Sequence, residues 1–316
     1  MTEPAGISVV IPNYNGTTLL KDNIPSIINA LNRWGGPHEI IIVDDCSVDE
    51  SCKVIMREFP AVKLIVNQAN AGFSRTCNRG FAEARYPIIL CINNDVKAEP
   101  DFVAPLLTHF SDSGVFAVTP NILAERDGKN QGIVSGGFGK GFIRGGFAPL
   151  DARGGVRENL YAVGACVAYD AAKLRDLGGY AEIYCPYLFE DVDLSYRGWK
   201  RGWKSLYEPA STVHHFSSAT IGRTKKRVKR TIYFRNRFLF HWINLTDPSF
   251  RAANYIHTAL RLLVSFLWLD LPYYASFFGA LRRLGEVRKL RKTVLATLAT
   301  GDAEIVARTG TPLRDR

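Results

Sequence analysis

The chain has 316 residues, 47% of them hydrophobic, which is enough to bury one large core or one core with a smaller appended region. Glycine, proline and charged residues occur at ordinary levels, which excludes a disordered or fibrous chain. Residues 1–219 hold 21 Lys/Arg and 24 Asp/Glu, whereas residues 220–316 hold 19 and 6, so a strongly basic tail follows a nearly neutral body.

Apolar runs alternate with helical repeats over the first hundred residues. Buried strands are predicted at residues 7–12, 39–45, 62–67 and 87–95, and helices between them at residues 17–34, 47–59 and 74–85. Ser47 is a predicted N-cap, with Glu50 at the capping-box spacing. This alternation predicts an α/β fold with a mostly parallel sheet.

Polar signatures stand at the carboxyl end of each predicted strand. NYN follows the first, DDCS the second, NQANAG the third, and NND closes the fourth. Because ligands of such sheets bind beyond the carboxyl ends of the strands, this clustering predicts a functional site there.

The next stretch, residues 125–160, is rich in glycine. It is either a mobile lid or a twisted hairpin, and the residues do not choose between them. A strand over 163–170, a short helix over 171–180, a helix over 189–202 and a strand with a loop over 203–220 are predicted after it.

Several carboxylates and histidines could carry chemistry, each with a structural alternative. Asp95 could hold a divalent metal or cap a loop. Glu190 and Asp191 could supply a general base or complement a helix dipole. His214 or His215 could bind metal or diphosphate, or be structural. Asp44 and Asp45 could accept a hydrogen bond from the imide of a pyrimidine base, or cap the helix with Ser47.

Five motifs in order, VVIPNYNG, IIVDDCSVDES, NAGFSRTCNRG, CINND and FEDVDLSYR, resemble the family 2 glycosyltransferases. The strongest likeness is to bacterial rhamnosyltransferase-like members that build cell-surface polysaccharides, and it covers about residues 7–240. It implies a GT-A fold, a Rossmann-like mostly parallel sheet flanked by helices, and inversion by direct displacement. We therefore expect a catalytic domain over residues 1–221, with nucleotide-sugar binding in 1–100 and the acceptor side in 101–221, and a helical region over 222–316.

The resemblance also implies roles for single residues. Asp191 would be the base, with Glu190 beside it, and His214 would complete the metal shell in an HxxxS element with Ser218. Asp95 would hold the metal. The residues implied to bind the nucleotide sugar are Pro12, Tyr14, Asn15, Asp44, Asp45, Asn70, Gly72, Asn78, Asn93 and Asn94.

One departure concerns the metal. The family's DxD position reads Asn93-Asn94-Asp95 here, so only one of the three residues is acidic. We therefore expect millimolar Mg²⁺ or Mn²⁺ to be required, rather than a permanently bound ion.

The basic tail has three interpretations: a membrane-surface element, a spanning helix, or an ordinary helical subdomain or homo-oligomer interface. Residues 262–281 are long enough to span, but Asp270 and Pro272 at their centre argue against it. On the membrane-surface interpretation, the basic run 225–230 meets anionic lipid or an acceptor diphosphate. The aromatics expected at the interface are Trp242, Phe266, Trp268, Tyr273, Tyr274, Phe277 and Phe278.

Other features narrow the class and the compartment. No basic segment followed by an apolar stretch opens the chain, and the six cysteines form no CxxC pair. We expect reduced thiols, no structural zinc, and a reaction at the cytoplasmic face, peripheral on the inner side of the cell membrane.

Three rival classes fit less well. A nucleic-acid-binding protein would carry its basic residues on the α/β body. A nucleotidyltransferase would show a glycine-rich basic loop after the first strand, and an oxidoreductase would show GxGxxG there. A nucleotide-sugar-binding protein without catalysis stays open. By resemblance, the donor is a dTDP- or UDP-sugar, dTDP-rhamnose first, and the acceptor is a lipid-linked saccharide or oligosaccharide.

Overall fold

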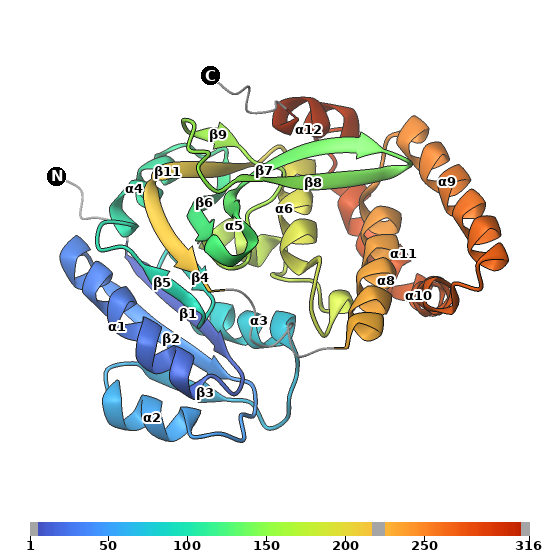
Figure 1. The fold of residues 1–316 in the computed structure, drawn as a ribbon. Helices are drawn as coiled ribbons and strands as arrows, with labels where there is room; N and C mark the ends of the chain where they lie inside the picture. The colour runs from blue at the N-terminus through green and yellow to red at the C-terminus, as the bar shows by residue number, and fades with distance from the viewer. Residues whose placement is uncertain (1–5, 217–224, 311–316) are drawn as a thin grey trace.

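The computed structural model describes residues 6–216 and 225–310. One mixed sheet forms its centre, with strands in the order β3-β2-β1-β4-β10-β6-β11-β5 (Figure 1). β1 pairs in parallel with β2 and β4, and β2 with β3. The strands span Ile7–Asn13 (β1), His38–Asp44 (β2), Lys63–Val66 (β3), Ile88–Ile92 (β4), Val96–Ala98 (β5), Val115–Ala124 (β6), Cys166–Asp170 (β10) and Lys204–His215 (β11).

The second half of the sheet mixes directions. β10 is antiparallel to both β4 and β6, while β11 runs parallel to β6 and antiparallel to β5. The predicted α/β class with a mostly parallel sheet is thus confirmed for the first four strands. The helices of this body span Thr17–Trp34 (α1), Ser51–Glu58 (α2), Phe73–Glu83 (α3), Val103–Leu107 (α4), Ala171–Asp176 (α5) and Glu190–Lys200 (α6).

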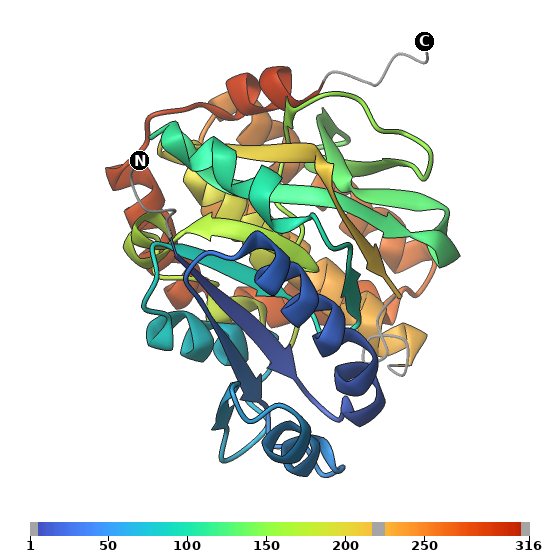
Figure 2. The ribbon, with the colours of Figure 1, turned by 90° about the vertical axis from the view of Figure 1, so that its left-hand side faces the viewer.

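Both faces of the sheet are covered, as Figure 2 shows for α1 on one side. Val9 on β1 belongs to one buried cluster with Leu20 and Ile24 of α1. Its neighbour Val10 belongs to another with Phe81 of α3. Successive residues of a strand face opposite sides of the sheet. Because both sides are buried here, the strand sequence is an unbroken apolar run.

The start of α2 differs from the prediction. The helix begins at Ser51 with no side-chain cap. Ser47 instead donates its hydroxyl to Asp44 Oδ2 at 2.7 Å and its backbone N–H to Asp44 Oδ1 at 2.8 Å. The predicted capping box was therefore wrong, because a carboxylate at the end of β2 takes the serine into the preceding turn.

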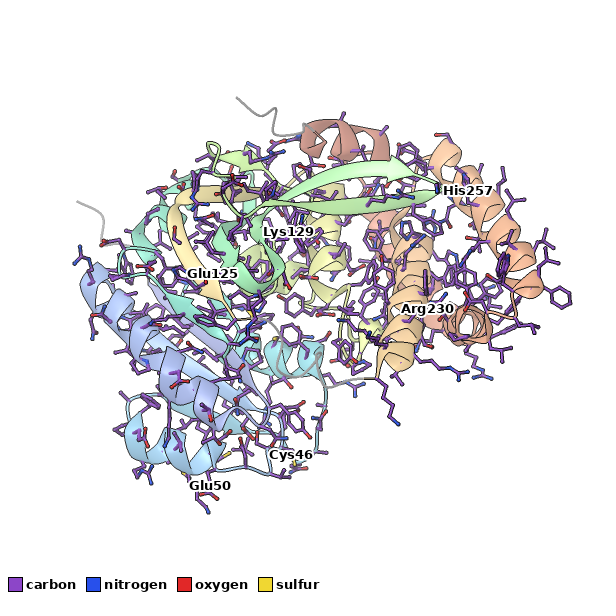
Figure 3. All side chains as sticks on the ribbon, in the orientation of Figure 1. Cys46, Glu50, Glu125, Lys129, Arg230 and His257 are labelled. Atoms are coloured by element: carbon purple, nitrogen blue, oxygen red, sulfur yellow. The ribbon has the colours of Figure 1, made fainter. Side chains whose placement is uncertain are left out.

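The glycine-rich stretch is a hairpin. Strands β7 (Lys129–Gly139) and β8 (Phe142–Pro149) pair in antiparallel fashion. Gly141 in its turn has φ +74°, and a Cβ there would meet the carbonyl of Ala253 at 2.6 Å, so only glycine fits this close approach. Figure 3 shows His257 of the neighbouring helix at this contact. Of the two interpretations left open, the structure supports the hairpin, docked by its tip on that helix.

A short strand, β9 (Arg157–Glu158), pairs with β11, and helices make up the described chain after residue 225. They span Lys226–Asn244 (α8), Pro248–Leu267 (α9), Leu271–Leu281 (α10), Leu284–Ala296 (α11) and Asp302–Thr309 (α12). Phe238 and Ile243 of α8 and Ile305 of α12 share the main core with the sheet. The buried ion pair Lys200–Asp302, at 2.7 Å, ties α12 to α6. The expected domain boundary at residues 221/222 falls outside the described residues.

The apolar run 262–281 is divided between two helices. Asp270 ends the turn between α9 and α10, accepts a hydrogen bond from the backbone N–H of Tyr273 at 3.4 Å, and pairs with Arg230 at 2.6 Å. Within residues 6–216 and 225–310, none of the helices combines the length and the apolarity that crossing a bilayer requires.

Candidate functional site

A cavity of about 980 Å³ lies at the carboxyl ends of β1, β2 and β4. Segments far apart in the sequence form its walls, and α8 of the C-terminal region closes one side. The predicted site residues that line it are Pro12, Tyr14, Asn15, Asp45, Asn70, Gly72, Asn93, Asn94, Asp95, Glu190 and Asp191. The other three, Asp44, Asn78 and His214, do not.

Asp45 organises one end of the cavity rather than pointing freely into it. Its carboxylate accepts hydrogen bonds from Asn67 Nδ2 at 2.7 Å and from the backbone N–H groups of Ala71 and Gly72 at 2.8 and 2.9 Å. It therefore holds the loop that precedes α3. Asp44 lies behind it, fully buried, where it accepts a hydrogen bond from Asn13 Nδ2 at 2.7 Å.

Gly72 is where this loop crosses the site. It has φ +86°, and a Cβ there would lie 3.3 Å from the carbonyl oxygen of Pro186. The backbone N–H of Phe73 donates to the same carbonyl at 3.2 Å. The loop before α3 and the loop before α6 thus meet over the cavity, and only glycine combines this φ with this contact.

Asn78 serves the same loop region from outside the cavity. Its Nδ2 donates to the carbonyl of Tyr180, and its Oδ1 accepts from the backbone N–H of Tyr180, both at 2.8 Å. The side chain is therefore fully engaged with protein.

The metal-binding candidates are a pair. Nε2 of His215 lies 3.3 Å from Oδ1 of Asp95, and the backbone N–H of Phe216 donates to the Asp95 carbonyl at 3.0 Å. Within the described residues, Asp95 Oδ1 accepts no hydrogen bond, although the side chain is only 9% exposed. A buried carboxylate oxygen without a donor is what a cation site presents.

His214 points elsewhere. Its Nε2 lies 2.8 Å from Glu99 Oε1, and its Nδ1 lies 3.5 Å from Glu125 Oε1. Adjacent residues on a strand face opposite sides, so only one of the two histidines can face the cavity. His215 therefore replaces His214 as the candidate ligand, while Ser218 lies outside the described residues.

The donor set fits a loosely held divalent ion. No group of three or more His, Cys, Asp or Glu side chains in residues 6–216 and 225–310 could enclose a metal. Mg²⁺ bound beside substrate phosphates needs only one or two protein carboxylates. The Asn93 side chain adds an Oδ1 that accepts no hydrogen bond from the described residues. Asn94 is engaged, because its Nδ2 donates to Asn13 Oδ1 at 2.7 Å.

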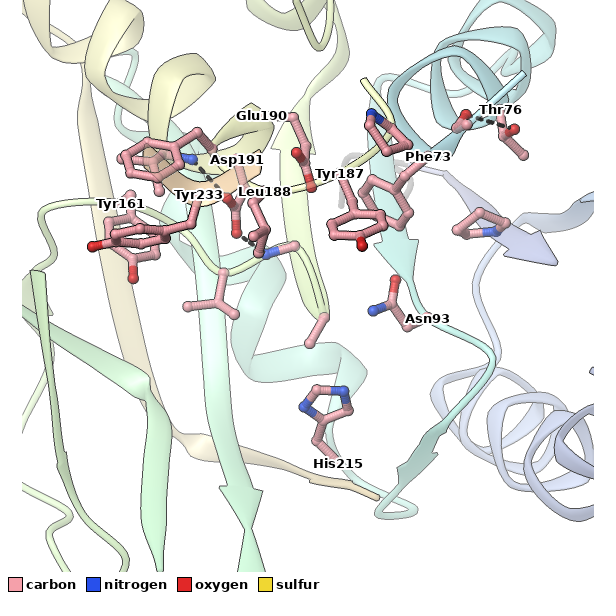
Figure 4. A pocket seen from close by; sticks show the side chains of 18 of the residues that line it. Phe73, Thr76, Asn93, Tyr161, Tyr187, Leu188, Glu190, Asp191, His215 and Tyr233 are labelled. Atoms are coloured by element: carbon pink, nitrogen blue, oxygen red, sulfur yellow. Dashed lines mark hydrogen bonds between the residues drawn. The ribbon is translucent and has the colours of Figure 1, made fainter. Parts of the chain in front are cut away.

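Glu190 and Asp191 open α6 at the other end of the cavity (Figure 4). Asp191 Oδ2 accepts from the backbone N–H of Gly164 at 2.9 Å, and Oδ1 accepts from that of Val192 at 2.8 Å. Leu188 and Phe189, just before them, have φ of 75° and 80°. Two consecutive non-glycine residues with positive φ mark a backbone held in a strained conformation directly before the two carboxylates.

The two carboxylates have different electrostatic environments. Burial, followed by the charge of Asp191, raises the pKa of Glu190 to about 8. Burial also raises the pKa of Asp191, but the N–H groups of Gly164 and Val192 oppose the rise. Near pH 7, Glu190 is therefore mostly protonated, whereas the Asp191 carboxylate keeps two N–H donors that favour its charged form.

The C-terminal region contributes what the motifs did not predict. Asn236 of α8 is fully buried, and its Nδ2 donates to the carbonyls of Tyr184, Tyr187 and Leu188 at 2.8, 3.0 and 2.7 Å. Arg235 donates to the Cys185 carbonyl at 2.6 Å. The loop that positions Glu190 and Asp191 is thus held in place by α8, a segment in which the sequence shows no catalytic motif.

The comparisons with curated proteins give distant relatives. The chain is 25% identical over 243 residues to the N-acetylglucosaminyl-diphospho-decaprenol L-rhamnosyltransferase of Mycobacterium tuberculosis, covering 69% of this chain and 78% of the relative. It is 26% identical over 214 residues to the pre-mycofactocin glycosyltransferase of the same species, covering 66% of this chain. There it spans only 42% of the relative's length.

Solved structures show the same fold. GalNAc-T7 with UDP, GalNAc and Mn²⁺ has a TM-score of 0.61 at 19% identity, over 77% of this chain and 48% of that one. The Pyrobaculum calidifontis mannosyltransferase with GDP-Man and Mn²⁺ has a TM-score of 0.56 at 15% identity, over 94% and 86%. These likenesses confirm the predicted GT-A type of fold. The family model described as Glycosyl transferase family 2 matches residues 8–178, more than half of the chain, and the protein therefore belongs to that family.

Proposed function

We propose that the chain is an inverting glycosyltransferase that moves a sugar from a nucleotide sugar to an acceptor hydroxyl with the help of Mg²⁺ or Mn²⁺. One observation carries the proposal. A buried carboxylate–histidine pair, Asp95 and His215, and a carboxylate suited to act as a base, Asp191, line the same cavity. A leaving diphosphate and an attacking hydroxyl need these two functions in one site.

Asp95 and His215 would hold the metal, which when bound supplies positive charge to the leaving diphosphate. The loop fixed by Asp45 and Gly72 forms the nucleotide end, where Pro12 and Tyr14 also line the cavity. Asn93 adds an amide beside the pair. These residues bind and orient the donor so that its anomeric carbon faces the other end of the cavity.

Asp191 takes the proton from the acceptor hydroxyl as that oxygen attacks. The N–H groups of Gly164 and Val192 fix its carboxylate, and its place in the first turn of α6 favours its anionic form. Because Glu190 is protonated near neutral pH, it places no second negative charge beside the base. Direct attack from this side inverts the anomeric configuration.

The donor proposed first is dTDP-rhamnose, and UDP-sugars come second. The support is the sequence motifs and the relative named as an L-rhamnosyltransferase. The acceptor proposed is a lipid-linked saccharide or a cell-envelope glycan, since that relative is named for a decaprenol diphosphate.

A surface at the α9–α10 turn supports a lipid-linked acceptor on the inner face of the membrane. Trp268 is 80% exposed and Leu267 is 78% exposed. An apolar group of this size, with basic residues nearby, suits an anionic lipid interface. The other exposed apolar residues there are Leu263, Phe266, Leu269 and Leu271.

The aromatics expected at an interface are only partly available. Phe266, Trp268 and Phe278 are exposed. Tyr273 is buried. Inside the helical layer, Trp242 stacks on Phe238, and Phe277 meets Phe238 edge to face. The proposed membrane contact therefore rests on the α9–α10 turn rather than on the whole apolar run.

The test is a panel of nucleotide sugars with and without Mg²⁺ or Mn²⁺, read by thermal shift and by release of nucleoside diphosphate. A ligand that binds only the folded chain raises its apparent stability. Metal-dependent stabilisation by one dTDP- or UDP-sugar supports the proposal and identifies the donor. Stabilisation without any turnover, with acceptor lipid present, would favour a binding protein instead.

Flotation with liposomes containing about 30% anionic lipid tests the membrane contact. We expect binding at low salt that weakens as salt rises, since screening shortens the reach of the charges. The double variant Leu267→Ser, Trp268→Ser should bind several-fold less. Equal binding of the variant would contradict the role of this turn.

A further inference from the structure

The acceptor end of the cavity holds two arginines that the proposed function does not use. Arg237 is on α8 and Arg144 is on β8, and both line the cavity. Neither forms an ion pair with any carboxylate in residues 6–216 and 225–310, whereas the buried Arg197 pairs with Asp193 at 2.6 Å. Cationic side chains without a counter-charge in a cavity indicate an anionic ligand.

Arg237 is held rather than free. Its guanidinium carbon lies 3.5 Å from the ring centroid of Phe142, so the planar group stacks on that ring. Burial is the largest cause that lowers its pKa, and the nearby charge of Arg144 also lowers it, whereas a hydrogen bond with the Tyr233 side chain raises it. A guanidinium held by stacking has lost much of its freedom before a ligand arrives, which favours a bidentate contact with an anion.

Two tyrosines stand beside the arginines. Tyr233 lies one turn before Arg237 on the same face of α8 and lines the cavity with Tyr161. Figure 4 shows both tyrosines on the Asp191 side, away from Phe73 and Thr76 at the nucleotide end. Their phenolic hydroxyls add hydrogen-bond donors beside the two guanidinium groups.

We propose that Arg144 and Arg237, with the hydroxyls of Tyr161 and Tyr233, bind a phosphate or diphosphate group of the acceptor. That the anion belongs to an acceptor rests on the proposed function. That these residues bind an anion does not. The position argues against the donor diphosphate, because the metal proposed to neutralise that group would be held by Asp95 and His215. His215, 3.3 Å from Asp95, lies elsewhere in the cavity, toward Asn93 (Figure 4).

Calorimetry on the full chain tests this site without donor and with EDTA, so that no metal supports a diphosphate at Asp95. The probes are geranyl diphosphate, inorganic pyrophosphate and geraniol. Geranyl diphosphate should bind, and geraniol should not. Tighter binding of geranyl diphosphate than of pyrophosphate identifies a lipid-linked group, and equal binding identifies the phosphates alone as the ligand; both support the site.

Arg144→Gln and Arg237→Gln should each weaken the binding of geranyl diphosphate by about tenfold, as loss of a charge-assisted contact does. Arg288→Gln, on the exposed side of α11, makes the same charge change away from the cavity and should leave binding unchanged. Arg144 is exposed on the hairpin, so its variant reports on the site even if Arg237→Gln unfolds.

Unchanged binding in Arg144→Gln and in a folded Arg237→Gln would overturn the proposal, as would equal binding of geraniol and geranyl diphosphate. It would also be overturned if both variants lost only metal-dependent binding of a nucleotide sugar, because the arginines would then serve the donor. Since no turnover is measured, a chain that never transfers a sugar can still show arginine-dependent binding. The two proposals therefore fail separately.

Discussion

The α/β body and the C-terminal helices contribute to the cavity in different ways. In the body, polar residues at the ends of strands form the proposed nucleotide end of the cavity and the Asp95–His215 pair. Short sequence motifs predict most of these residues. In the C-terminal region, Asn236 of α8 holds the loop before α6, and Arg237 of α8 lines the cavity, although neither belongs to a motif. The GT-A body and its appended helices therefore line a single cavity, in which the appended part holds a loop of the body.

The largest effect is expected at the end of the cavity that both regions form. Asp191→Asn keeps the shape of the side chain but cannot accept a proton, so kcat should fall by about a thousandfold. Donor binding, measured by thermal shift, should persist. Near-normal turnover by this variant would show that another group is the base.

The next effect separates the two histidines of β11. His215→Ala should raise the metal concentration needed for half-maximal activity by about 10–100-fold, because one of the two candidate ligands is lost. The matched variant His214→Ala should change it little, since His214 contacts Glu99 and Glu125 instead. Titration of activity with Mn²⁺ measures both, and equal shifts would contradict the assignment.

A third effect tests the C-terminal region directly. Asn236→Ala leaves three carbonyls of the loop before α6 without their donor, so kcat should fall by about tenfold and stability by about 2 kcal/mol. Asn254→Ala is the control: it removes an equally buried amide that donates to the Gly141 carbonyl at 2.8 Å. It should lower stability but not kcat, and a similar loss of kcat in both would mean that the effect is general loosening.

The smallest effect concerns Glu190 and pH. The folded pKa is about 8, above the ordinary value of 4.5, so the folded state holds a proton that the unfolded state loses. The stability that this gives is complete below about pH 4.5 and is lost as pH rises toward and through 8. Glu190→Gln should remove this loss, raising Tm at pH 8 by about 2–5 °C relative to wild type, with little change at pH 5.

Scans of Tm against pH for the two proteins check this. Parallel curves from pH 5 to pH 8 would show that Glu190 is charged in the folded protein. In that case, Asp191 would not be the only anionic carboxylate at this end of the cavity.

Site residues could be predicted from the sequence where the local pattern of one strand or helix determines which end of the element they occupy. The sequence pattern predicted that Asp95 closes a buried strand segment and that Asp191 opens a helix, and both side chains line the cavity, whereas their roles stay predictions. His214 and His215 could not be separated, because neighbouring residues of β11 face opposite sides and only the pairing with β5 shows which side faces Asp95. Asp44 and Asn78 were assigned to the nucleotide sugar, whereas their side chains hold turns.

The C-terminal region was harder to predict for a physical reason. Its aromatic residues are frequent enough to suggest an interface, but Tyr273 and Trp242 pack within the helical layer once α10 folds back on α8. Asn236 gives no signal in a single sequence, because its three partners are backbone carbonyls about fifty residues away. Any residue can supply a backbone carbonyl, so such long-range contacts leave no recognisable pattern of residue types in the sequence.

The most direct test of the central claim is calorimetric binding of the nucleotide sugar selected by the panel, with Mn²⁺ and with EDTA, to the wild-type chain and to Asp95→Asn. The account predicts binding by the wild type that requires Mn²⁺ and is lost, or weakened by at least about tenfold, in Asp95→Asn. Metal-independent binding of equal strength in both proteins would contradict a metal-assisted nucleotide-sugar site in this cavity.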